Sequence, residues 1–262
     1  MFNWIPVPDF PRPKEQSAIL GERILVQSCM ISVDMWFAAY LIYFPADPVA
    51  PNGMVRIRQD LVLLESREPE AAFEKAQQIG NSKIYSEGEP LLDFQGLTDL
   101  IPLRAGIHDG AVIDTSSDSI GTEEIRLFLA AKEDLTVRVQ EEEIESDGRN
   151  HWYLAQLVFS SLPQWELEAD RQQVMKELVL VKANESDGAF YRAVVFGKDR
   201  SIRLQPAEPG GRWHFRGLND LSVIEDPISD GMVLLSERFQ VPLGHQTNLV
   251  RTKEEMKALI IH

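Results

Sequence analysis

The chain has 262 residues, of which 44% are hydrophobic and 26% charged, and its formal net charge is -15 at pH 7. This composition is typical of a folded globular protein and excludes disorder for most of the chain. The negative charge repels phosphate backbones, so we expect no nucleic-acid binding; it favours encounter with a basic protein partner.

The N-terminal region, residues 1–33, is predicted to be an extended arm and lead-in. Four prolines between positions 6 and 13 prevent regular strand pairing there, and no signal peptide is visible. The longest apolar stretch, residues 35–44, is far shorter than the ~20 residues that a membrane helix needs. The single cysteine, Cys29, excludes an internal disulfide. We therefore expect a cytoplasmic protein without membrane contact.

Five short blocks recur in the same order in the two halves of the chain. The paired blocks are 36–39 and 152–155, 61–64 and 178–181, 72–80 and 189–197, 94–100 and 215–221, and 109–112 and 230–233. The offset grows from 116 residues for the first pair to 117 and then 121, and the length changes fall between blocks, where loops tolerate insertion. The recurrence predicts an internal duplication, with repeat units at 34–135 and 150–262 joined by an acidic connector at 136–149.

The first three pairs of blocks predict two strands and a helix in each unit. Aromatic-led runs at 36–44 and 152–159 are typical of strands, and the Leu-Val runs at 61–64 and 178–181 indicate strands buried on both faces. The Ala-Phe-x-x-Ala pattern places apolar residues on one helical face. We expect Gly80 and Gly197 to end these helices, because glycine adopts the left-handed conformation readily.

The last two pairs predict further strands. The Phe-x-Gly-Leu-x-Asp-Leu block lies in a long strand, with its glycine at a bulge or a close approach of another backbone. Asp-Gly at 109–110 and 230–231 indicates a turn into a last strand. The predicted fold class is α+β, each unit an antiparallel sheet of four to five strands covered by one helix. A terminal helix is expected in each unit, at 122–132 and 252–260.

These blocks resemble a bacterial family, the domain of unknown function 4288 family. Its members have an aromatic-led first strand like residues 36–39, an apolar strand leading into an Ala-rich helix like 61–80, and a Phe-x-Gly-x-x-Asp-Leu strand like 94–100. The resemblance covers about 34–115 and 150–238, which implies two tandem copies. It supports the α+β fold, and it implies no activity because the family has no established one.

The sequence contains no recognisable catalytic, cofactor or metal motif. No two of the five histidines have metal-ligand spacing, and neither a glycine-rich phosphate loop nor a Gly-x-Ser-x-Gly motif is present. We therefore expect no cofactor and no metal site, and a protein that is more readily explained as a non-enzyme.

A few polar residues are nevertheless candidates for a binding site. Asp99 and Asp220 occupy equivalent positions; two carboxylates held close together can perform acid–base chemistry, although a local hydrogen bond to the backbone is the simpler role. His214 and Arg216 belong to a basic, aromatic strand, where a packed or surface role is the alternative. Together with Arg104, these residues are predicted to line a cleft between the two repeats.

These observations lead to a functional hypothesis with two alternatives. We expect a non-catalytic protein-binding module, for example an immunity or antitoxin-like protein that neutralises a basic partner. The alternatives are an enzyme of unrecognised class with its site between the repeats, or a ligand-sensing or self-associating scaffold. The acidic charge has a simpler explanation in solubility alone.

Overall fold

The computed structural model describes residues 35–45, 53–83, 92–121, 129–130, 135, 149–162, 171–204, 212–256 and 259. The expected N-terminal arm, nearly all of the connector at 136–149 and most of the expected helix at 122–132 lie outside these residues. The described residues belong to one compact unit, Val33–His262. Among them, no helix is long and apolar enough to cross a membrane.

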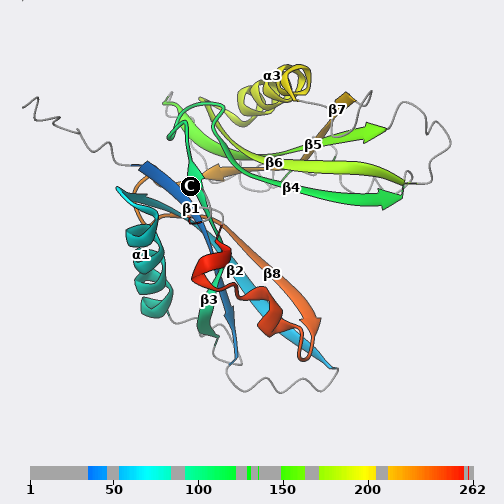
Figure 1. Cartoon of the computed structure of the whole chain (residues 1–262). Coiled ribbons are helices and arrows are strands. Elements are labelled where there is room, and N and C mark those ends of the chain that lie inside the picture. The colour runs from blue at the N-terminus through cyan, green and yellow to red at the C-terminus, as the bar shows by residue number, and fades with distance from the viewer. Residues whose placement is uncertain are drawn as a thin grey trace, which may run out of the picture. The chain divides into compact units, whose positions relative to one another are not determined.

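The first sheet is antiparallel and has four strands in the order β3-β1-β2-β8 (Figure 1). They are β1 (Met35–Phe44), β2 (Met54–Ser66), β3 (Asp93–Leu103) and β8 (Val233–Pro242). Helix α1 (Pro69–Ser82) covers one face, where Ala72 and Ala76 pack against β1 and β2. Leu61, Val62, Leu63 and Leu64 of β2 are all buried, so the prediction of a strand buried on both faces is confirmed.

The second sheet is also antiparallel and has four strands in the order β4-β6-β5-β7. They are β4 (Val112–Gly121), β5 (His151–Leu162), β6 (Arg171–Ala183) and β7 (Arg212–Ile224). Helix α3 (Ser186–Arg203) covers one face, with Ala189 and Ala193 in the core beneath it. The α+β class is therefore confirmed, with two antiparallel four-stranded sheets and two main helices among the described residues.

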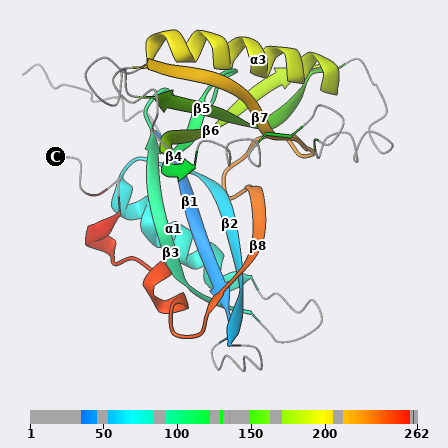
Figure 2. The same ribbon diagram turned by 90° about the vertical axis from the view of Figure 1, so that its right-hand side faces the viewer.

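Each sheet takes its fourth strand from the other half of the chain (Figure 2). Strand β4 follows β3 in the chain but pairs with β6, and β8 follows β7 but pairs with β2. Each exchanged strand pairs along nine positions of its new neighbour. The expectation that one half builds a whole sheet is wrong, because the turn after β3 or β7 carries the chain to the opposite sheet instead of back into a hairpin.

The first of these crossings is held by Asp109 and Gly110. Gly110 has φ 86°, a left-handed conformation that favours glycine, and its N–H donates to the Leu180 carbonyl at 2.8 Å. The Asp109 carboxylate accepts from the Lys182 N–H at 2.8 Å and also pairs with Arg192 of α3. We call this set of contacts the first clasp.

The second crossing repeats the same contacts with the halves exchanged. Gly231 has φ 81°, and its N–H donates to the Leu63 carbonyl at 2.8 Å. The Asp230 carboxylate accepts from the Glu65 N–H at 2.8 Å and pairs with Lys75 of α1. This second clasp confirms that both Asp-Gly pairs form turns into the last strand.

The segments that follow the exchanged strands also pack on the sheet they have joined. After β4, the Ala130 N–H donates to the Leu218 carbonyl of β7 at 3.0 Å, and after β8 the Arg251 N–H donates to the Leu97 carbonyl of β3 at 2.9 Å. Of the helix expected at 252–260, the structure has the 3-10 turn Lys253–Glu255 and helical geometry at Leu259. Met256 between them is buried in the core of the first sheet.

Gly80 and Gly197 lie inside their helices, so the prediction that they end them is wrong. A Cβ at Gly80 would lie 2.4 Å from the Phe94 ring, and one at Gly197 would lie 2.3 Å from the Phe215 ring. Any larger residue would collide with an aromatic ring from β3 or β7. These glycines are therefore explained by close packing of helix on strand.

The glycine bulges predicted in the long strands are confirmed. Gly96 has φ 147° and Gly217 has φ 151°. The β1–β3 register shifts between Ile42 and Tyr43, next to Gly96, and the β5–β7 register shifts at the equivalent place next to Gly217. The bulges lie at the same position in both sheets.

The two sheets share a core where their inner faces meet. This cluster takes Ala38, Leu61 and Leu63 from the first sheet and Leu154, Leu178 and Leu180 from the second. The cluster occupies one end of each sheet; beyond it, polar side chains face each other across a cleft.

Candidate functional site

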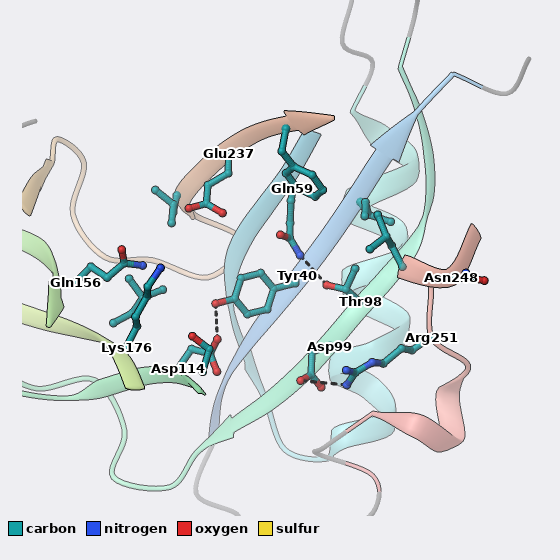
Figure 3. A pocket seen from close by; sticks show the side chains of 16 residues that line it. Tyr40, Gln59, Thr98, Asp99, Asp114, Gln156, Lys176, Glu237, Asn248 and Arg251 are labelled. Atoms are coloured by element: carbon teal, nitrogen blue, oxygen red, sulfur yellow. Dashed lines mark hydrogen bonds and ion pairs between the residues drawn. The ribbon is translucent and has the colours of Figure 1, made fainter. Parts of the chain in front are cut away.

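A cavity of about 460 Å³ lies between the two sheets and is lined mainly by polar side chains (Figure 3). The first sheet with the segment after it contributes Tyr40, Gln59, Thr98, Asp99, Glu237, Asn248 and Arg251, and the second sheet contributes Asp114, Gln156 and Lys176. A second cavity of about 350 Å³ shares Gln156 and Glu237 and adds Asn219 and Asp220. We call the two cavities together the inter-sheet cleft.

The strand period places Tyr40 of β1 in this cleft. Successive side chains of a strand point to opposite faces, so Tyr40 lines the cleft while Ala39 and Leu41 lie in the core beneath α1. A register shift follows Tyr40 in the pairing with β3. The partner of Tyr40 in this register is Asp99, so both groups reach the same part of the cleft.

Tyr40 links the two sheets directly. Its hydroxyl donates to Asp114 Oδ2 of β4 at 2.7 Å, as Figure 3 shows, and Asp114 Oδ1 accepts from the Thr115 N–H at 2.7 Å. Burial raises the pKa of Tyr40, and the neighbouring Asp114 carboxylate raises it further. The phenol therefore remains protonated and acts as a hydrogen-bond donor at neutral pH.

Asp99, next to Tyr40 in the same cavity, has two partners of its own. It is 7% exposed, its Oδ1 accepts from the Leu100 N–H at 2.9 Å, and its Oδ2 lies 3.6 Å from Arg251 Nη1. The expected local hydrogen bond to the backbone is thus present. Because the carboxylate is held by the backbone, its position in the cleft is fixed.

The charges that line the cleft are predominantly negative. The carboxylates are Asp99, Asp114, Asp220 and Glu237, and the cations are Lys176 and Arg251. A polar cleft between low-dielectric walls strengthens such a field. The arrangement therefore attracts a cationic group into the space between the sheets.

The structure separates the five residues that the sequence singled out. Asp99 and Asp220 line the two cavities of the cleft. Arg104 is exposed just after β3, and His214 and Arg216 are exposed on β7. The Arg216 Nε donates to Ser160 Oγ at 2.6 Å. These three residues are not among those that line the cleft.

Sequence reasoning missed Tyr40, Asp114, Lys176 and Glu237. One signal was available: Tyr40 and Gln156 are equivalent positions, and each places a polar group within an otherwise apolar strand. Such a position, polar in both halves, indicates a side chain that faces something other than the core. Asp114 and Glu237 carried no comparable signal, because their neighbours in the exchanged strands are also polar, Thr115 and Ser116 beside Asp114 and Ser236 and Arg238 beside Glu237.

Two ion pairs, each with a fully buried carboxylate, lie outside the cleft and join each helix to its sheet. Glu177 of β6 is fully buried and accepts three hydrogen bonds from Arg200 of α3, at 2.9 to 3.1 Å. Its equivalent, Asp60 of β2, is fully buried and lies 3.6 Å from Lys83 at the end of α1. Burial lowers the pKa of Lys83, and Asp60 opposes that effect. Because the two ion pairs occupy equivalent positions in the two halves, we interpret them as structural.

No group of three or more His, Cys, Asp or Glu side chains in the described part of the chain could hold a metal ion. No curated protein and no solved structure is significantly similar to the chain. A family model matches the second half and not residues 34–115, where the sequence predicts another copy. The matched segment, residues 152–236, extends from β5 into β8, and its family is described as Domain of unknown function (DUF4288).

Proposed function

We propose that the protein is a non-catalytic protein-binding module and that its inter-sheet cleft receives basic side chains of a protein partner. The observation that carries this proposal is the charge of the cleft, where four carboxylates face two cations. Asp99 is buried and Asp114 half-buried, and they already accept a backbone and a phenol hydrogen bond. These two carboxylates are therefore held in place, so little of their side-chain entropy is lost when a cation enters.

The charge of the whole chain supports the same partner class. A net charge of -15 attracts basic proteins from a distance and accelerates their encounter. An immunity or antitoxin-like protein that neutralises a basic toxin is a function of this kind. Such a protein needs a rigid complementary surface and no chemistry of its own.

We also propose that the chain arose by duplication of one unit, giving two tandem copies of the matched family. Support comes from the equal order of strands and helices in the two halves. The duplication is also supported by the equivalent bulges, by the glycines packed against Phe94 and Phe215, and by the two clasps. The partner would then meet a cleft whose two walls are related by approximate two-fold symmetry.

The experiment that tests the proposed function uses the full chain and a short arginine-rich peptide as the probe. We expect Glu237→Lys, in the cleft, to weaken binding at least about tenfold. Glu74→Lys on α1 makes the same charge change on an exposed helix face, and it should leave affinity within about twofold. Equal weakening by both variants, or no binding of the peptide, would contradict the proposal.

The natural partner can be sought by co-expression with the products of neighbouring genes. We expect a stable complex that Glu237→Lys disrupts and Glu74→Lys does not. A complex that is insensitive to both variants would exclude the cleft as its site.

A second candidate function is supported by the size of the cavity. About 460 Å³ lies within the ~300–1,000 Å³ of small-molecule pockets, and its lining offers both signs of charge. A ligand sensor, or an enzyme of unrecognised class, would use the same cleft. Thermal stabilisation by a small cationic metabolite, lost in Glu237→Lys, would favour this alternative over a protein partner.

A further inference from the structure

The outer face of α3 carries a line of exposed apolar side chains. Tyr191, Val195 and Ile202 are 61%, 59% and 83% exposed. At 3.6 residues per turn they fall within about 40° of one another around the helix, and so they form one stripe along α3. The exposed Lys198 lies on the same side, between Val195 and Ile202. Figures 1 and 2 show α3 lying on one face of its sheet. Ala189 and Ala193, which pack in the core, lie on the opposite side of the helix from the stripe.

The equivalent helix shows that the fold does not require this stripe. In α1 the positions that correspond to Tyr191 and Val195 are Glu74 and Gln78, and both are exposed. The position that corresponds to Ile202 lies outside the described residues. The two helices pack on their sheets through the same alanines and glycine. The apolar outer face is therefore a property of α3 alone, and exposed apolar surface of this kind marks an interaction site.

Charges along one flank of the stripe are self-complementary. Arg192 and Asp199 lie on the same side and seven residues apart, about 10 Å along the helix. If a second α3 packs antiparallel with its two-fold axis near Val195, each Arg192 lies opposite the Asp199 of the second copy. Arg192 already pairs with Asp109, and Asp199 pairs with Arg203. A guanidinium has five donors and a carboxylate has two oxygens, so each group can serve a second partner as well.

We infer that α3 is a homodimerisation face, on which two copies of this chain pack their α3 helices antiparallel. The occupant is a second copy because a two-fold contact is the commonest symmetric arrangement and the charges that flank the stripe are self-complementary. One helix face per copy buries an area near or below the lower limit of specific interfaces. The dimer is therefore reversible, with a dissociation constant on the order of 10–100 µM. This inference does not depend on the proposed cleft function.

Sedimentation velocity of the full chain over a concentration series tests the inference. We expect the monomer to convert to a dimer as the concentration rises, and Val195→Glu to weaken the dimer at least about tenfold. Asp199→Arg should weaken it about three- to tenfold, because an arginine then faces Arg192 of the second copy. Since Val195 and Asp199 are exposed, we expect unchanged circular dichroism and thermal unfolding in both variants.

The matched control is Gln78→Glu, which adds the same negative charge at the equivalent position of α1. It should dimerise like the unaltered chain. A chain that remains monomeric up to a concentration on the order of 1 mM would overturn the inference. So would a dimer that persists in Val195→Glu, or one that Gln78→Glu weakens equally.

Discussion

Replacing Gly197 by alanine should destabilise the protein, although alanine is the better helix former. A Cβ at this position would lie 2.3 to 2.7 Å from three ring atoms of Phe215. The Phe215 ring lies against the helix on one side, and its centroid is 5.7 Å from that of the tilted Phe159 ring, so it cannot move away freely. Overpacking of this kind lowers the free energy of unfolding by about 1–3 kcal/mol. The higher helix propensity of alanine offsets up to about 1 kcal/mol of that loss.

The same helix supplies a matched control for this prediction. A Cβ at Gly188 would have no neighbour closer than 3.5 Å. Gly188→Ala should therefore stabilise the protein by about 0.5–1 kcal/mol, while Gly197→Ala lowers the free energy of unfolding by about 1–2 kcal/mol. Urea denaturation at 25 °C measures both variants.

A double-mutant cycle separates the ring contact from other effects. Phe215→Leu alone removes part of the core and should cost about 1–2 kcal/mol. In the Gly197→Ala background the same change should cost markedly less, because it also relieves the collision. If Gly197→Ala stabilised the protein as much as Gly188→Ala, the explanation of both helical glycines would be refuted.

Two further predictions concern groups that join the sheets and helices. Tyr40→Phe removes the hydrogen bond to Asp114 and should lower the free energy of unfolding by about 1–2 kcal/mol. Folding raises the pKa of Tyr40, so above about pH 10 only the unfolded phenol ionises. The unaltered protein should therefore lose stability as the pH rises above about 10. Chemical denaturation between pH 8 and about 11 checks this, and an equal slope in Tyr40→Phe would contradict it. Arg200→Ala leaves the buried Glu177 carboxylate unpaired and should lower the free energy of unfolding by about 2–4 kcal/mol. The neighbouring exposed pair gives the comparison: Arg203→Ala should change stability by less than about 0.5 kcal/mol, and similar losses in both variants would count against a structural role for the buried pair.

Local patterns in the sequence predicted those features that neighbouring residues determine. As predicted, the Leu-Val runs lie in buried central strands, and Gly96 and Gly217 of the long strands lie at bulges. The Asp-Gly pairs became turns. Each of these depends on the alternation of a strand or on the backbone freedom of glycine, and both are visible within a few residues.

Features that depend on distant partners were missed. A glycine near the end of a helical pattern indicates a C-terminal cap, and only the later strand reveals that Phe94 or Phe215 occupies its side. Similarly, the Asp-Gly turns predict that a strand follows but do not specify which sheet that strand joins. The exchange of these strands was therefore not predictable from local periodicity.

The cleft was predictable only in part for the same reason. Asp99 and Asp220 were found because they recur at equivalent positions. Asp114 and Lys176 reach the cleft because β4 and β6 are paired in the second sheet, which faces the first. The prediction also included Arg104, His214 and Arg216, because their side chains suit a binding site. All three are exposed and do not line the cleft.

The most direct test of the exchanged fold is cleavage of the connector in the intact protein. A specific protease site is placed within residues 136–148 of the full chain, and the cleaved protein is analysed by size-exclusion chromatography with light scattering. We predict that the two fragments elute together as a 1:1 complex and unfold in one transition, because each sheet needs a strand from each fragment. Separation of the fragments without denaturant, or two independent unfolding transitions, would contradict the reciprocal exchange of β4 and β8.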